Sequence, residues 1–264
     1  MTERLLSTND PAPFEWHNPH HSGELLITCD HGGREFPGAL GSLGLAPSDT
    51  ERHIAWDIGA LDLAKELSNR LRSPLVAGTY SRLVVDLNRF PEDPTSIAQH
   101  SDQTAVPGNS ALSATAKQQR VDEIFTPYHS EIRQHLANAR AVRREPIIIF
   151  VHSFTPHFER SHRPWPVGLL SNEDRRLTDP LLHELGAVCG LNVGDNQPYS
   201  GRDPYSYSSA VHAESDGLRH TVIEVRQDLI ADEAGVLRWA EILSGALRGA
   251  IKRMDPTFNL TDET

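Results

Sequence analysis

Two histidines in this chain each follow a short apolar run that is typical of a buried β-strand. His31 comes after Leu25–Cys29 and one aspartate, and His152 directly follows the run 146–151. The carboxyl ends of parallel strands meet at one edge of a sheet, so both imidazoles are expected at the same edge. Asp57, at the start of a predicted helix, should return to that edge as well. Two imidazoles and one carboxylate, with a fourth position open, form a ligand set of catalytic zinc.

Each of these residues also has an ordinary structural explanation. His31 lies in a strand-to-loop turn, where Gly32 and Gly33 permit unusual backbone dihedrals and a close approach by a ligand. Asp57 could simply cap its helix, because aspartate is favoured there for dipole and hydrogen-bond reasons. Asp30 could accept a ring N–H as an outer partner of a metal ligand. Residue types and spacing leave both explanations open.

A further carboxylate, Glu224, lies in the apolar segment 220–226. With the strand period of two, Val222, Glu224 and Arg226 share one face. A buried glutamate needs a partner or a function. It either pairs with Arg226 or acts as a general base on metal-activated water, with a pKa raised by burial.

Asn88 and Arg89 follow the apolar segment 83–87, which is predicted as a strand. An arginine with a neighbouring amide can clamp a carboxylate through paired hydrogen bonds, whereas a surface salt bridge is the alternative for Arg89. Arg82 should lie at the opposite end of that strand unless the strand bends.

The composition indicates one large domain. The chain has 264 residues, with 38% hydrophobic and 23% charged, and shows no linker. Two cysteines give no disulfide framework, and no apolar run approaches the roughly 18 residues of a membrane span. We therefore expect a cytoplasmic protein without export. A net charge of −11 disfavours nucleic acid and anionic membranes as partners, but a small acidic substrate can still be held by one or two arginines. The oligomeric state stays open.

Strands alternate with helices along the chain, which predicts an α/β sandwich with a mostly parallel sheet. Residues 1–23 are expected to form a loosely packed arm, and 24–255 a single catalytic domain. The irregular segments 91–112 and 194–217 are expected to cover the active face. The predicted strands span 25–29, 74–77, 83–87, 146–151, 167–170 and 220–225, and the predicted helices span 57–72, 114–144, 173–190 and 232–253, the last capped by Asp232.

Five motifs, taken in order, are similar to the N-formylglutamate amidohydrolase family. They are DHGGREFP, HIAWDIGALDLAKELSNRL, YSRLVVDLNR, VHSFTP and HTVIEVRQDL, and the resemblance covers roughly residues 24–250. That family resembles zinc carboxypeptidases, aspartoacylases and cell-wall amidases. The resemblance therefore implies a three-layer α/β/α sandwich around a mixed, mostly parallel sheet, and cleavage of an amide by metal-activated water.

The resemblance also implies roles for individual residues. His31 and His152 would be the first and last metal ligands, and Glu224 would be the general base and acid. Asn88 and Arg89 resemble the Asn-Arg pair with which aspartoacylases hold a substrate carboxylate.

The resemblance leaves two residues for the middle metal ligand. In carboxypeptidases and aspartoacylases it is a glutamate three residues after the first histidine, a position that Arg34 occupies here. Glu35 is one place off and remains an alternative. The cell-wall amidases take this ligand from the start of the following helix, which corresponds to Asp57, and we favour Asp57.

The expected activity is that of a zinc-dependent amidohydrolase, with another divalent metal as an alternative. It would remove the formyl group of a small acidic N-acyl amino acid such as N-formyl-L-glutamate, while Arg82 or Arg226 adds positive charge at the developing oxyanion. Three other functions stay open: deacylation of another N-acyl amino acid, cleavage of peptidoglycan fragments, and non-catalytic binding of small acidic metabolites.

Overall fold

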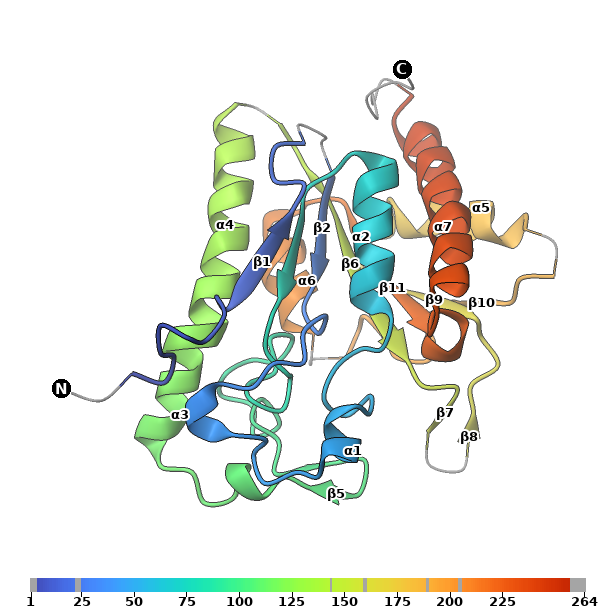
Figure 1. Cartoon of the computed structure of the whole chain (residues 1–264). Coiled ribbons are helices and arrows are strands. Elements are labelled where there is room, and N and C mark those ends of the chain that lie inside the picture. Colours follow the sequence, from blue (N-terminus) through green and yellow to red (C-terminus); the bar gives the residue numbers. More distant parts are fainter. Residues whose placement is uncertain are drawn as a thin grey trace.

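A mixed sheet forms the centre of the protein in this computed structural model (Figure 1). The structure describes residues 4–21, 25–142, 144–158, 161–188, 190–203 and 206–256. Within these ranges the main sheet has seven strands in the order β1-β3-β2-β6-β11-β9-β10. Their bounds are β1 Phe14–His17, β2 Leu25–Cys29, β3 Leu75–Gly78, β6 Ile147–Phe154, β9 Val167–Leu170, β10 Val193–Asp195 and β11 His220–Arg226.

Helices and short hairpins connect and cover these strands. The helices are α1 Pro47–Thr50, α2 Ala60–Leu71, α3 Ala114–Arg120, α4 Thr126–Ala141, α5 Thr178–Gly186, α6 Tyr207–His212 and α7 Glu233–Met254, with a π-helical turn Val121–Phe125 between α3 and α4. Single turns of 3₁₀ helix occur at Gly38–Leu40, Pro107–Asn109, Glu214–Asp216 and Gln227–Leu229. The two hairpins pair β4 His100–Ser101 with β5 Thr104–Ala105, and β7 His157–Phe158 with β8 Ser161–His162.

The four central strands β3, β2, β6 and β11 run parallel to one another. At one edge β1 is antiparallel to β3, and on the other side β9 is antiparallel to β11 and carries β10 parallel to itself. The sheet is therefore mixed and mostly parallel, as predicted. The carboxyl ends of β2 and β6 lie at the same edge, which is the arrangement that the two histidines require.

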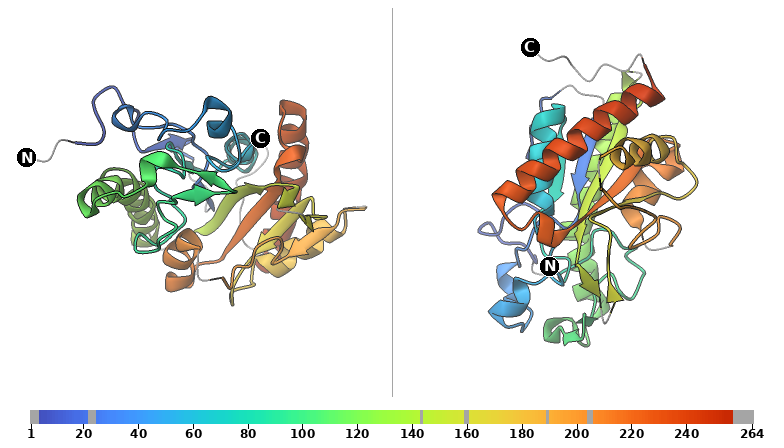
Figure 2. Two further views of the ribbon diagram at one scale, coloured as in Figure 1. Left: turned by 90° about the horizontal axis from the view of Figure 1, so that it is seen from below. Right: turned by 90° about the vertical axis from the view of Figure 1, so that its right-hand side faces the viewer.

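Each face of the sheet packs against its own helices, and Figure 2 shows the sheet from two further directions. Alternate residues of β2, such as Leu25 and Ile27, join a core with α2, α5 and α7. The residue between them, Leu26, joins a second core that α4 and its preceding turn complete. This alternation follows from the strand period of two and confirms the three-layer α/β/α sandwich.

Two expected strands differ from the observed chain path. Residues 83–87 are buried, but they form turns rather than a strand, with Val84 N bonded to Ser81 O and Asp86 N to Ser96 O. Most of residues 83–87 are apolar because they pack in the second core, and a buried segment need not form a strand. Conversely, β6 continues to Phe154, so His152 lies inside this strand and not beyond its end.

The amino-terminal prediction of a loosely packed arm is wrong for Phe14–His17. These residues form β1 and pair with β3 in antiparallel register, because the aromatic side chains of Phe14 and Trp16 pack on the second core. At the other end of the chain, Asp232 caps α7 as predicted, since its side chain accepts a hydrogen bond of 2.8 Å from Gly235 N.

Helix bounds differ from prediction at both ends. The helix expected over 173–190 is α5, which begins only at Thr178 and ends at Gly186, and α2 begins at Ala60. The irregular segments contain more structure than expected, since 91–112 includes the β4–β5 hairpin and 194–217 includes α6.

Cys29 is a buried free thiol, and Cys189 lies outside the described residues.

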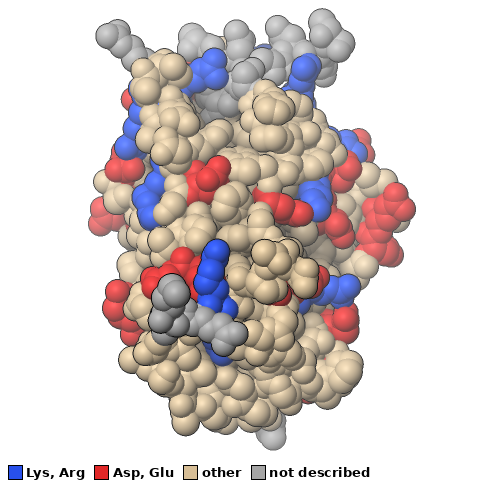
Figure 3. Space-filling view, turned by 60° about the vertical axis from the view of Figure 1, so that its left-hand side comes forward, with Lys and Arg blue, Asp and Glu red and all other residues tan. Residues whose placement is uncertain are grey.

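Charged side chains of both signs are interspersed over the face drawn in Figure 3. The net charge of −11 is therefore accompanied by local basic groups on that face. Among the described helices, none is long and apolar enough to cross a membrane.

Candidate active site

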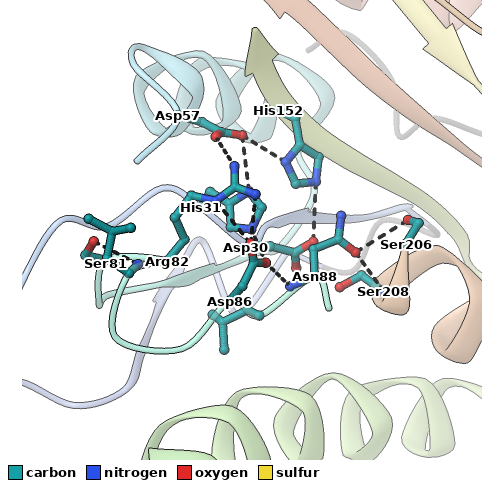
Figure 4. Close-up of polar contacts among 12 residues, drawn as sticks. Asp30, His31, Asp57, Ser81, Arg82, Asp86, Asn88, His152, Ser206 and Ser208 are labelled. Atoms are coloured by element: carbon teal, nitrogen blue, oxygen red, sulfur yellow. Dashed lines mark hydrogen bonds and ion pairs between the residues drawn. The ribbon is translucent and has the colours of Figure 1, made fainter. Parts of the chain in front are cut away.

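His31, Asp57 and His152 converge at the carboxyl ends of β2 and β6 (Figure 4). One ligand atom from each of them lies within 4.8 Å of the others. Asp57 Oδ2 is 3.4 Å from His31 Nδ1 and 2.9 Å from His152 Nδ1. All three residues are buried. The predicted trio is therefore brought together by the fold.

The helix-capping explanation for Asp57 is wrong. The N-cap of α2 is Gly59, and no side chain of the described residues caps this helix. Gly59 has a φ of 76°, and a Cβ there would collide with the carbonyl oxygen of Ile230, so only glycine fits. Asp57 N instead donates to His31 O at 2.9 Å, which joins the two segments that carry these residues. The Asp57 carboxylate is left to face the histidines.

The donor set fits a divalent metal ion. Tetrahedral zinc with bonds of about 2.0–2.1 Å places its ligand atoms about 3.3 Å apart, close to the two distances observed here. His31 Nδ1 is buried without a hydrogen-bond partner among the described residues. A ring nitrogen that ligates a metal ion makes no hydrogen bond, so this observation fits a ligand role. Burial alone would raise the pKa of Asp57, but His31 and His152 hold it well below its usual value, so this residue is a carboxylate anion.

An outer carboxylate, Asp86, fixes the orientation of the first histidine. Asp86 Oδ1 lies 2.7 Å from His31 Nε2, and Asp86 Oδ2 accepts hydrogen bonds from Arg82 Nη2 at 2.7 Å and Arg82 Nε at 3.1 Å. When Nε2 carries the ring proton and donates it to Asp86, the lone pair of Nδ1 points at the cluster. The sequence analysis missed Asp86. Its signal was an acid in the middle of an apolar run.

A second outer carboxylate, Asp30, lies beside His152 rather than beside its sequence neighbour. Asp30 Oδ2 is 3.4 Å from His152 Nε2, and Asp30 Oδ1 accepts a 2.7 Å hydrogen bond from Tyr128 Oη. Tyr128 belongs to α4 and is fully buried. Sequence reasoning foresaw an outer role for Asp30, but not Tyr128, because only the packed α4 brings that hydroxyl close.

Arg82 reaches the cluster because the chain turns where a strand was predicted. Its Nη1 lies 3.4 Å from Asp57 Oδ1, in addition to its two bonds with Asp86. The guanidinium therefore links a candidate metal ligand to the outer carboxylate. The expectation that Arg82 lies at the far end of a strand is wrong.

Glu224 lies on β11 directly beside His152 of β6 in the parallel register. Its Oε2 is buried without a hydrogen-bond partner among the described residues, and burial raises the pKa of Glu224 to about 7. The alternative ion pair with Arg226 does not form. Arg226 instead binds the Asp228 carboxylate, with Nε–Oδ1 at 2.8 Å and Nη2–Oδ2 at 3.2 Å. The geometry thus leaves Glu224 available for proton transfer.

A cavity of about 200 Å³ joins these groups to the expected substrate-binding pair. Asn88 Oδ1 accepts hydrogen bonds from Ser208 N at 3.0 Å and Ser206 Oγ at 3.4 Å, which leaves its NH₂ group as a donor. The cavity is lined by His31, Asp57, Arg82, Asn88, Arg89, His152, Ser153, Leu170, Tyr199, Ser200, Asp203, Ser206, Val222 and Glu224.

Two residues from the sequence analysis are not brought to this cavity. Arg226 is held by Asp228 outside the lining. Glu35 is exposed, lines a separate cavity and bonds through its backbone to Thr79 and Ser81. Of the two middle ligands that the sequence left open, only Asp57 lies with the histidines.

The sheet topology and the buried cluster define an α/β/α protein with a candidate metal centre at the carboxyl ends of its parallel strands. Comparison of the sequence with protein families makes the class specific. The chain belongs to the N-formylglutamate amidohydrolase family, whose sequence profile matches residues 23–231.

Individual relatives agree with this membership. The chain is 27% identical over 268 residues to the N-formylglutamate deformylase of Pseudomonas aeruginosa, covering 96% of this chain and 95% of that protein. The solved structure of the gene product Atu2144 from Agrobacterium tumefaciens is 31% identical, with a TM-score of 0.93 over 96% of this chain and 100% of the other. An N-formylglutamate amidohydrolase from Ralstonia eutropha JMP134 shares the fold, with 20% identity and a TM-score of 0.63 over 91% and 98% of the two chains.

Proposed function

We propose that this protein is a metal-dependent amidohydrolase that converts N-formyl-L-glutamate and water into formate and L-glutamate. The observation that carries the proposal is the meeting of His31, Asp57 and His152 in one cavity with the unpaired Glu224. The names of the relatives supply the substrate. We assign the activity to one catalytic domain, residues 24–255, to which β1 adds an edge strand.

The three ligand side chains are held ready for a cation by the outer groups. A divalent cation such as zinc, when bound, polarises the amide carbonyl and acidifies the attacking water. Asp86 holds the His31 ring and Asp30 lies against the His152 ring, so neither imidazole needs to reorient on binding.

Glu224 moves the protons of the reaction. Because burial raises its pKa to about 7, the carboxyl group both accepts and gives up a proton near neutral pH. Glu224 takes one proton from the attacking water as the new C–O bond forms. It passes that proton to the amide nitrogen as the C–N bond breaks, so that glutamate leaves as the amine and formate as the acid.

The arginines and the amide orient the substrate. The Asn88 NH₂ group and Arg89 line the cavity, where together they hold a substrate carboxylate. Arg82, fixed by Asp86 and Asp57, contributes positive charge where the carbonyl oxygen becomes negative. Arg226 has no part in this mechanism.

Metal analysis and substrate comparison test the proposal. The purified protein should contain about one metal ion per chain. It should release formate from N-formyl-L-glutamate, lose this activity with a chelator and recover it with added zinc. Hydrolysis of N-acetyl-L-aspartate in place of the formyl compound would identify a different deacylase. Binding of N-formyl-L-glutamate without metal or turnover would identify a binding protein.

A further inference from the structure

Arg163 carries a buried guanidinium group next to the cavity. The residue follows β8 and is 8% exposed. Its Nη1 donates to Thr155 Oγ1 and Tyr199 Oη, both at 3.2 Å, and approaches Thr155 O at 3.4 Å. Among the described residues, no carboxylate forms an ion pair with Arg163, and its polar contacts are with uncharged groups.

Aromatic rings surround this cation. The guanidinium carbon lies 4.8 Å from the ring centroid of Tyr199, 5.0 Å from that of Phe158 and 5.8 Å from that of Phe154. Such rings attract a cation and offset part of its desolvation cost, but they do not neutralise it. Among the described residues, the positive charge of Arg163 is therefore not balanced by a carboxylate, and Tyr199, which Arg163 contacts, lines the cavity.

Tyr199 connects Arg163 with that cavity. Its side chain lines the cavity while its oxygen accepts the hydrogen bond from Arg163. An oxygen that accepts from a cation becomes a stronger O–H donor, and this hydroxyl has no acceptor among the described residues. Tyr199 is 43% exposed, so it lies toward the open rim of the cavity.

The other anion-binding pair lies close to the candidate metal ligands. Asn88 N donates at 2.9 Å to Asp86 Oδ1, the same oxygen that contacts His31 Nε2. The Asn88 backbone is therefore anchored at the carboxylate that orients His31, and Tyr199 lines the same cavity with a partly exposed side chain. In an N-acyl amino acid the α-carboxylate is next to the amide and a side-chain carboxylate is farther away.

We propose that Tyr199, oriented and polarised by Arg163, binds the side-chain carboxylate of the substrate, while Asn88 and Arg89 bind its α-carboxylate. This inference rests on the proposed function and specifies its substrate class as dicarboxylic N-acyl amino acids. Tyr199 determines specificity by direct contact. Arg163 is a positioning residue that acts through Tyr199.

The Tyr199→Phe variant and a pair of substrates test this assignment. N-formyl-L-glutamine has the shape of N-formyl-L-glutamate but a neutral side-chain amide. The wild type should show a KM about tenfold lower for the glutamate compound, which corresponds to one charge-assisted hydrogen bond of about 1.4 kcal/mol. Tyr199→Phe should bring the ratio of the two KM values near one, with kcat on N-formyl-L-glutamate changed less than about twofold. Tyr207→Phe removes a tyrosine hydroxyl outside the cavity lining and should keep the wild-type ratio.

Variants of Arg163 separate positioning from folding. Arg163→Met should reduce the KM ratio as Tyr199→Phe does, and Arg163→Lys, which keeps a cation, should restore most of it. The double variant Tyr199→Phe with Arg163→Met should show the same KM ratio as the Tyr199→Phe variant, because both substitutions act on one hydroxyl. A purely structural Arg163 would change stability without changing the ratio, and that result would overturn its role.

The outcomes also distinguish this inference from the proposed function. Turnover of N-formyl-L-glutamate with an unchanged KM ratio in folded Tyr199→Phe refutes the inference and leaves the function standing. Turnover of neither compound by the wild type refutes the function. Calorimetric titration of both compounds then decides the inference, because the wild type should bind the glutamate compound about tenfold more tightly and Tyr199→Phe should bind both equally.

Discussion

Replacement of Glu224 by glutamine isolates the proton-transfer step. The two side chains have nearly the same shape, so strand β11 and its register with β6 should persist. Glu224 Oε2 has no hydrogen-bond partner among the described residues, so the substitution breaks no contact of that oxygen. Glutamine cannot accept the water proton, and this is the property that the variant removes. Glu224 is not among the three candidate ligands, so metal content should stay at the wild-type level.

The expected loss follows from the role of a general base. Such a group contributes about 10²- to 10⁴-fold, or about 3 to 5 kcal/mol of transition-state stabilisation, so kcat should fall by that factor. The pH profile adds a second signature. With a pKa of about 7, Glu224 is a carboxylate above that pH and a carboxylic acid below it. Wild-type activity should therefore drop about tenfold for each pH unit below the pKa of Glu224. A bound cation lowers this pKa, so in the metal-loaded enzyme this acid limb of the pH profile should lie at lower pH. Glu224→Gln should lack this limb.

The assay follows formate release together with the metal content of each protein. Glu241→Gln is the matched control, since it changes an exposed carboxylate on α7, outside the cavity lining. That variant should keep wild-type activity. Wild-type turnover by Glu224→Gln, or an unchanged acid limb in its profile, would refute the assignment of Glu224 as the base.

Three other predictions test the supports of the site and the stability of the fold. Asp86→Asn should weaken zinc affinity about 10- to 100-fold in a competition titration, because the His31 ring loses its charged acceptor, and unchanged affinity would contradict this role. Gly33→Ala should lower the free energy of unfolding by about 2 kcal/mol or more, because the added Cβ would collide with a backbone carbonyl. Gly245→Ala, whose Cβ would lie in open space on α7, should instead raise the free energy of unfolding by about 0.5–1 kcal/mol. Urea denaturation measures both changes. Burial lowers the pKa of His129 to about 3 and of His212 to about 4, so both stay neutral in the folded metal-free protein while the unfolded chain binds protons near pH 6.5. The two histidines should consequently lower its unfolding free energy by about 3.5 kcal/mol between about pH 6 and 4.5. The raised pKa of Glu224 has the opposite sign and offsets about 1.5 kcal/mol of this, so the net fall should be about 2 kcal/mol. A constant unfolding free energy over this range would contradict the shifts.

The sequence predicted the convergence of His31, Asp57 and His152 because simple patterns locate these residues. Leu25–Cys29 and the run before His152 are apolar and bounded by polar residues, and two such parallel strands must end at one edge. The prediction failed where one pattern has two meanings. Residues 83–87 are mostly apolar because they are buried, but no strand among the described residues pairs with them. Arg82 and Asp86 consequently lie nearer to the cluster than a straight strand would allow.

Other parts of the site depend on tertiary packing that no local pattern reports. Tyr128 reaches Asp30 only when α4 lies on the sheet, and the two residues are 98 positions apart. Arg226 illustrates the opposite error. The sequence placed Arg226 on the same strand face as Glu224. It did not show that Asp228 would bind the Arg226 guanidinium and hold it away from the cavity.

His31, Asp57 and His152 come from three distant segments, and the last two are 95 positions apart. An unfolded chain does not gather them, so a cation that they hold binds almost only to the folded protein. By mass action, a free cation concentration one hundred times its dissociation constant adds about 2.7 kcal/mol to the unfolding free energy. The thermal midpoint should therefore rise with added zinc, and cellular metal supply would set how much of this protein survives heat and proteolysis.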